Sequence, residues 1–142
     1  MEKIKTLVIA SGYFNPIHKG HIEYLNRSKS LGDYLFVILN NDYQRTLKGS
    51  KEFMREDERR IILKNIKCVD DVIISIDTNR QVDNTVEFIY KEMKNKYQKF
   101  IFTNGGDQTS DTIAEKDICT KLGIEMVFGL GDKIQSSSWL IK

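Results

Sequence analysis

Residues 6–25 read Thr6-Leu-Val-Ile-Ala-Ser-Gly-Tyr-Phe-Asn-Pro-Ile-His-Lys-Gly-His-Ile-Glu-Tyr-Leu25, and this stretch decides the fold. Residues 6–10 form an apolar run, which is typical of a strand buried on both faces of a parallel sheet. Apolar residues then recur at helical spacing from His21 towards Gly32, where we expect the helix to end. A glycine-containing turn joins the two elements. Such a strand, turn and helix start form a concave anion site, because free N–H groups at a helix N-terminus point at the ligand.

The turn carries His18 and His21, the only two histidines of the chain. Gly20 between them leaves room for a ligand to approach the backbone. Two imidazoles three residues apart at a helix start can both reach one phosphate. A zinc site is the competing interpretation, since histidine is a common metal ligand. Zinc requires three or four ligands, and no third candidate lies nearby in the sequence. We therefore expect a phosphate site and no metal site built by the protein.

Length and composition restrict the remaining possibilities. The chain has 142 residues, enough for a single domain over 1–142 with a real core. Its net charge of +2 is too small to indicate nucleic acid or an acidic membrane as a partner. No apolar run approaches the ~20 residues of a membrane span, and no signal peptide is evident. Cys68 and Cys119 have the character of small buried hydrophobes, so we expect a reduced, cytoplasmic protein.

Further apolar runs alternate with helical patterns along the chain. Runs at 34–39, 72–76, 99–103 and 124–128 predict four more strands. Helical spacing appears at 55–66, 86–93 and 114–122, the last ending at Gly123. This alternation predicts an α/β fold with a doubly wound, Rossmann-like, five-stranded parallel sheet and helices on both faces.

The segment Gly12-Tyr-Phe-Asn-Pro-Ile-His-Lys-Gly-His21 closely resembles the signature of the cytidylyltransferase-like nucleotidyltransferases. That superfamily includes glycerol-3-phosphate cytidylyltransferase, the heptose-phosphate adenylyltransferase domain and archaeal FAD synthetase. The resemblance implies transfer of a nucleoside monophosphate from an NTP to a phosphorylated acceptor, with release of pyrophosphate. It implies that His18 and His21 are catalytic, and that the nucleotide is bound by Gly12, Tyr13, Phe14, Asn15 and Gly20.

A polar segment at 44–51 follows the second predicted strand and carries Arg45, Lys48 and Lys51. We expect a glycine-containing loop at the sheet edge where ligands bind. The resemblance implies that Lys48, in its Leu-Lys-Gly context, contacts the phosphates as a catalytic cation, while most charge runs are merely solvated. Arg59 also fits a family arginine, although a helix-surface position explains it equally well.

Two later motifs extend the resemblance over nearly the whole chain. Glycines after the fourth predicted strand permit close approach of a ligand to the backbone, and the family often carries Gly-Gly-Asp near the nucleotide. Three serines near the end can cap a short helix or hold a triphosphate tail, and the family has a serine- and threonine-rich motif there. The nucleotide-binding residues so implied are Gly105, Gly106, Asp107, Ser136, Ser137 and Ser138.

The mechanism expected from these residues is positioning and cationic stabilisation of an α-phosphorus under attack by an acceptor phosphate. Mg²⁺ would arrive on the substrate phosphates. The donor, CTP or ATP, is left open, and the short chain favours a small polyol or sugar phosphate as acceptor. A nucleotide-binding module without chemistry is the alternative. We also expect a homodimer with the first helix near the contact, and Trp139 serving as a core or interface anchor.

Overall fold

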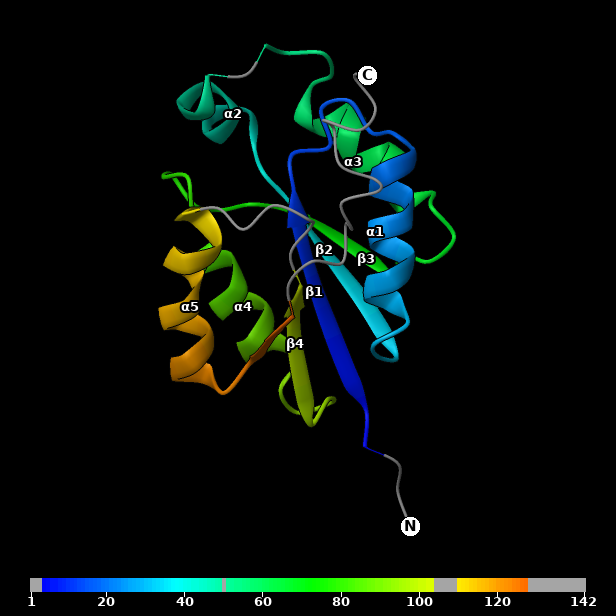
Figure 1. The fold of residues 1–142 in the computed structure, drawn as a ribbon, viewed down its shortest axis with the longest axis vertical. Helices are drawn as coiled ribbons and strands as arrows, with labels where there is room; N and C mark the ends of the chain where they lie inside the picture. The colour runs from blue at the N-terminus through cyan, green and yellow to red at the C-terminus, as the bar shows by residue number, and fades with distance from the viewer. Residues whose placement is uncertain (1–3, 50, 104–109, 128–142) are drawn as a thin grey trace.

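A five-stranded parallel sheet forms the centre of the molecule, with strand order β3-β2-β1-β4-β5 (Figure 1). The computed structural model describes residues 4–49, 51–103 and 110–127, the side chains of 110–114 excepted. This architecture confirms the predicted doubly wound α/β fold. The strands are β1 (Thr6–Gly12), β2 (Tyr34–Leu39), β3 (Asp71–Ile74), β4 (Lys99–Thr103) and β5 (Glu125–Val127). The helices are α1 (Lys19–Lys29), α2 (Asp42–Lys48), α3 (Glu56–Lys64), α4 (Asp83–Met93) and α5 (Ser110–Leu122).

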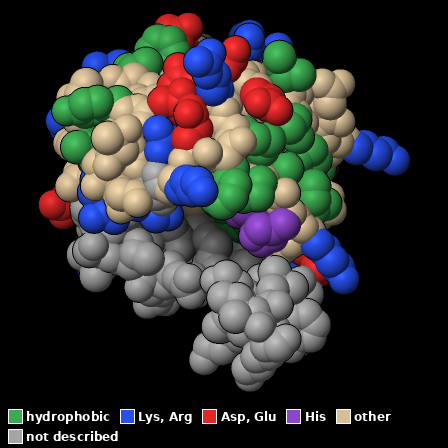
Figure 2. All heavy atoms as spheres, turned by 90° about the horizontal axis from the view of Figure 1, so that it is seen from above, with side chains coloured by type: hydrophobic (Ala, Val, Ile, Leu, Met, Phe, Trp, Pro, Cys, Tyr) green, Lys and Arg blue, Asp and Glu red, His purple; other side chains and the backbone are tan. Residues whose placement is uncertain are grey.

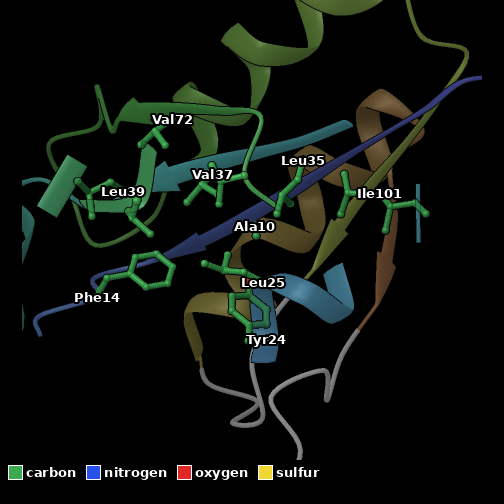
Figure 3. Close-up of a cluster of buried hydrophobic side chains, with 12 residues drawn as sticks. Ala10, Phe14, Tyr24, Leu25, Leu35, Val37, Leu39, Val72 and Ile101 are labelled. Carbon is green, nitrogen blue, oxygen red and sulfur yellow. The ribbon is translucent and has the colours of Figure 1, made fainter. Parts of the chain in front are cut away.

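Two hydrophobic cores cover the two faces of the sheet. Helices α1 and α3 lie on one face, and α4 and α5 lie on the other (Figure 1). Because successive strand residues point to opposite faces, Val8 and Ala10 of β1 pack towards α1, while Leu7 and Ile9 pack towards α4. Figure 3 shows the first core, where side chains of β1 and β2 meet those of α1. Burial on both faces explains why the strands read as continuous apolar runs.

The order of the strands places the functional edge of the sheet. The chain moves from β1 to β2 and β3 in one direction, and then crosses β1 to build β4 and β5 on its other side. In open α/β sheets a ligand binds outside the carboxyl ends of the strands at this reversal. The turn that carries the histidines follows the carboxyl end of β1, so it lies at this point of the fold.

The predicted loop over 44–51 is wrong, because residues 42–48 form the short helix α2. Polar caps explain the helix. Asn41 accepts a hydrogen bond from the Gln44 N–H, and the Gln44 side chain accepts one from the Asn41 N–H, which together form a capping box. Gly49 ends the helix with φ of 84°, a conformation that glycine adopts without strain. Lys48 therefore lies in the last turn of a helix.

The predicted first helix is also misplaced at both ends. It begins at Lys19 rather than His21 and ends at Lys29, short of Gly32. Gly32 instead lies against β1: a Cβ at this position would be 2.7 Å from Val8 Cγ2 and 2.9 Å from the Thr6 carbonyl oxygen. The glycine is thus required by close approach of the chain to the sheet and not by helix termination. Of the two thiols, Cys119 is buried and Cys68 is half-buried.

Candidate active site

His18 and His21 organise the start of α1 through their own side chains. His18 is the N-cap residue, and its Nδ1 accepts a hydrogen bond from the Gly20 N–H at 3.1 Å. His21 lies three residues later, and its Nδ1 accepts from the His18 N–H at 3.1 Å. The pair takes the places of the serine or asparagine and the glutamate or glutamine of an ordinary capping box. Local chain geometry therefore fixes both imidazoles at the helix N-terminus.

These contacts decide which nitrogen carries the proton. A backbone N–H can only donate, so the Nδ1 atom facing it must present a lone pair. In the neutral ring the hydrogen is then on Nε2. The two rings stack with centroids 3.9 Å apart and an interplanar angle of 28°. Both imidazoles are thus set to donate hydrogen bonds through Nε2.

The environment of His21 keeps its ring neutral. Its pKa is lowered from 6.5 to about 4, first by burial, then by the neighbouring His18 and the cation of Lys48. A neutral ring retains the lone pair on Nδ1 that caps the helix. His21 therefore offers one donor to a ligand without a net charge of its own.

Phe14 supports the ring of His21 from the core side. Its side chain is buried, and its ring meets that of His21 edge-on, with centroids 4.9 Å apart. The backbone at Phe14 has φ of 49°, a left-handed conformation unusual for a non-glycine residue, as is often found at functional sites. Gly12 makes room for this ring, since a Cβ there would lie 3.0 Å from two of its carbon atoms. Both residues were expected to bind nucleotide, and the structure gives them packing roles.

Lys48 lies beside the histidine turn, although 27 positions separate it from His21 in the sequence. Its Nζ is 4.4 Å from the centroid of the Tyr13 ring, within range of a cation–π interaction. Its charge contributes to the lowered pKa of His21. The structure therefore brings the three predicted catalytic residues together.

Two residues near the site have partners that sequence reasoning missed. Arg59 is 1% exposed and is not on the helix surface. It donates to the carbonyls of Tyr13, Asn40 and Met54 and pairs with Asp42 at 2.7 Å. The Asn15 side chain binds the backbone of residues 51–54. No local pattern marks these contacts, because their partners lie 5 to 46 positions away in the sequence and mostly in other elements.

Seen from above the carboxyl ends of the strands, the histidines lie at the surface beside a basic side chain and apolar side chains (Figure 2). Lys51 and Lys19 are exposed, and Gly20 is buried. The remaining predicted nucleotide-binding residues lie outside the described residues: Gly105, Gly106, Asp107, Ser136, Ser137 and Ser138, as does Trp139. Among the described residues, no group of three His, Cys, Asp or Glu side chains is placed to hold a metal ion.

Comparison with known proteins places this site in a family. The family model described as cytidylyltransferase-like matches residues 9–130, which include the histidine turn and α2. The chain belongs to the cytidylyltransferase-like family. The match begins within β1 and includes the whole of β2, β3, β4 and β5, so the family assignment and the fold agree.

Relatives of this chain include an FAD synthase and the bifunctional protein HldE. The FAD synthase of Picrophilus torridus is 35% identical over 118 residues, which cover 82% of this chain and 77% of that protein. The bifunctional protein HldE of Syntrophotalea carbinolica is 35% identical over 121 residues, covering 84% of this chain but only 23% of the relative. The chain thus spans about a quarter of the length of the HldE relatives it matches.

A solved structure of similar fold is the lipopolysaccharide core biosynthesis protein from Thermoplasma volcanium GSS1. It is 30% identical, with a TM-score of 0.66 over 87% of this chain and 93% of that chain. In the part of the chain that the structure describes, none of the helices has the length and apolar character needed to cross a membrane.

Proposed function

We propose that this protein is a nucleotidyltransferase that moves a nucleoside monophosphate from CTP or ATP to a small phosphorylated acceptor. The observation that carries the proposal is the pair of stacked imidazoles whose Nδ1 atoms both accept backbone N–H bonds, beside the Lys48 cation. Membership of the cytidylyltransferase-like family supports it. An acceptor phosphate oxygen attacks the α-phosphorus and forms a new P–O bond, while the bond to the β-phosphate breaks and pyrophosphate leaves.

The two Nε2–H groups donate to oxygens of the α-phosphate, and Lys48 balances the negative charge that gathers there. Rigid donors of this kind are most effective where charge develops in the transition state, because they need no reorganisation during the reaction. The helix start fixes their direction.

The tautomers of the histidines also bear on the acceptor. A ring whose Nδ1 accepts from the backbone and whose Nε2 carries a proton has no free lone pair with which to act as a base. An alcohol or amine would need a base to become a nucleophile, whereas a phosphate monoester is already anionic near pH 7. The geometry therefore favours a phosphorylated acceptor. A small polyol phosphate or sugar phosphate is the acceptor class we propose.

In this proposal Mg²⁺ is carried by the substrate phosphates and not by a site that the protein builds. The hydrated ion binds through one or two carboxylates and the substrate phosphates, and the described residues offer no three-ligand cluster. The residues proposed to hold the nucleotide and the leaving pyrophosphate include Gly105, Gly106, Asp107 and Ser136 to Ser138.

The experiment is a measurement of pyrophosphate release with CTP and ATP against a panel of phosphorylated polyols and sugars. His21→Asn places an oxygen where Nδ1 lies and lacks a donor at the position of Nε2. We expect it to lower kcat by about 10²–10³. His21→Gln is the matched control. Gln44 of α2 already shows that a glutamine at this cap position can accept from the N-cap N–H. Its amide nitrogen meanwhile donates to a carbonyl outside the helix, that of Asn79. It should retain more activity than His21→Asn.

A non-catalytic nucleotide-binding module is the alternative function. Calorimetry that detects NTP binding, together with no pyrophosphate release for any acceptor of the panel, would support that alternative. Equal kcat for the wild-type protein and His21→Asn would reject the proposed role of the imidazole.

A further inference from the structure

The turn between β1 and the histidines sends three successive side chains in three directions. Phe14 is buried against His21, as described above. The Tyr13 ring lies beneath the Lys48 ammonium at 4.4 Å. Asn15 reaches across to the chain that follows α2. One turn therefore contacts both His21 and Lys48, although these residues belong to different elements.

The Asn15 amide holds the segment just beyond Lys48. Its Oδ1 accepts hydrogen bonds from the N–H groups of Phe53 at 2.9 Å and Met54 at 3.0 Å. Its Nδ2 donates to the Lys51 carbonyl at 2.7 Å. Oδ1 thus accepts two hydrogen bonds, and Nδ2 donates one of its two hydrogens. This side chain fastens the backbone three residues after Lys48.

The other end of α2 is fastened independently. The Asn41 side chain donates to the carbonyls of Ser75 and Asp77, and the Gln44 side chain donates to those of Asn79 and Gln81. Gln44 is also the only buried residue of this helix. None of its residues belongs to either hydrophobic core, and α2 stands away from the sheet in Figure 1, so packing on the core does not position it. The place of Lys48 is thus set by polar contacts at the N-terminal end of a seven-residue helix and in the segment 51–54 that follows it.

We propose that Asn15 is a positioning residue that holds Lys48 against the histidine pair, by tying residues 51–54 to the turn that carries both Tyr13 and the histidines. This inference rests on the proposed function only through the catalytic role of Lys48. It differs from the expectation that Asn15 binds the nucleotide. If Asn15 bound the nucleotide, its replacement would lower the affinity for NTP. If Asn15 positions Lys48, its replacement has an effect only when Lys48 is present.

A double-mutant cycle separates these roles. The variants are Asn15→Ala, Lys48→Met and the double variant, each with kcat and KM measured for the NTP. Misplacement of a catalytic group by about 1 Å can cost up to ~10²-fold in rate, so we expect Asn15→Ala to lower kcat with little change in KM. In the Lys48→Met background the same substitution should leave kcat unchanged. An equal fold-loss in both backgrounds, or a raised KM at constant kcat, would overturn the proposal.

A second readout requires no substrate and no activity. Lys48 contributes to the lowered pKa of His21, so NMR titration of the His21 ring reports where the ammonium lies. Asn15→Ala should raise that pKa towards its value in Lys48→Met, with no further rise in the double variant. A titration identical to wild type would reject the positioning role. Absence of transfer activity from the wild-type protein, with this shift present, would reject the proposed function alone.

Asn15→Ser is a milder variant, included in case Asn15→Ala does not fold. Its hydroxyl is shorter than the amide and cannot make all three bonds, but it keeps a polar group in the turn. Far-UV circular dichroism and the melting temperature establish that each variant is folded. Asn15→Ser should lie between the wild-type protein and Asn15→Ala in kcat and in the pKa of His21. If it is folded and matches wild type in both, the proposal fails.

Discussion

Acidification should destabilise this protein through His21, and replacing that residue by glutamine should remove the effect. The pKa of His21 is about 4 in the folded protein, against 6.5 for a free side chain. Between these values the unfolded chain binds a proton that the folded protein does not. The free energy of unfolding therefore falls as the pH drops from about 6.5 towards 4. Above pH 6.5 the neutral His21 ring makes its full contribution to stability.

The size of the effect follows from the two pKa values. Because only the unfolded chain binds this proton, the free energy of unfolding falls by about 2 kcal/mol between pH ~7.5 and pH ~5. The physical reason is that protonation would place a cation in a partly buried site beside His18 and Lys48. A proton on Nδ1 would also end the bond accepted from the His18 N–H. His21→Gln keeps a cap of the kind that Gln44 makes in α2, and does not titrate.

Urea unfolding followed by far-UV circular dichroism at the two pH values measures this difference. All other titrating groups are shared by the two proteins, so their contributions cancel to first order. We expect the wild-type protein to lose about 2 kcal/mol more than His21→Gln on acidification. Equal losses would refute the reasoning, because they would mean that the imidazole is not held neutral by the fold.

Two further predictions concern stability and assembly. Arg59→Met should lower the free energy of unfolding by about 3 kcal/mol, because it leaves Asp42 and three carbonyls without their buried donor. The exposed Arg55→Met is the control and should change stability by under ~0.5 kcal/mol; similar melting temperatures for the two would contradict the bracing role. We also expect a homodimer, so light scattering at micromolar concentration should give about twice the single-chain mass of 16.5 kDa. A mass that stays at 16.5 kDa, with and without NTP, would exclude the dimer.

Features encoded in neighbouring residues were accessible from the sequence. A strand between two layers of helices must be apolar on both faces, so β1, β2 and β4 stand out as apolar runs with nearly correct ends. The histidine pair was also recognisable, since His18 and His21 are the N-cap and N3 residues of the same helix start. Their hydrogen bonds run between residues two and three apart, and such contacts leave a short-range pattern.

Helix α2 was missed because its stability comes from polar caps rather than an apolar stripe. Tyr43 and Leu47 are exposed, and the helix buries only Gln44. Its signals are the Asn41 and Gln44 capping box and the glycine that ends it. A search for hydrophobic periodicity does not register these residues, whereas a search for caps could have found them.

The sequence by itself therefore determined the sheet, the helices that cover it and the residues at the start of α1. Only the tertiary structure decided how Lys48 meets those residues and what Arg59 and Asn15 do. Arg59 and Asn15 act on backbone atoms up to 46 and 39 positions away, and backbone carbonyls and N–H groups look the same at every position of a sequence. Such partners become evident only when the crossing of the strands brings the segments together.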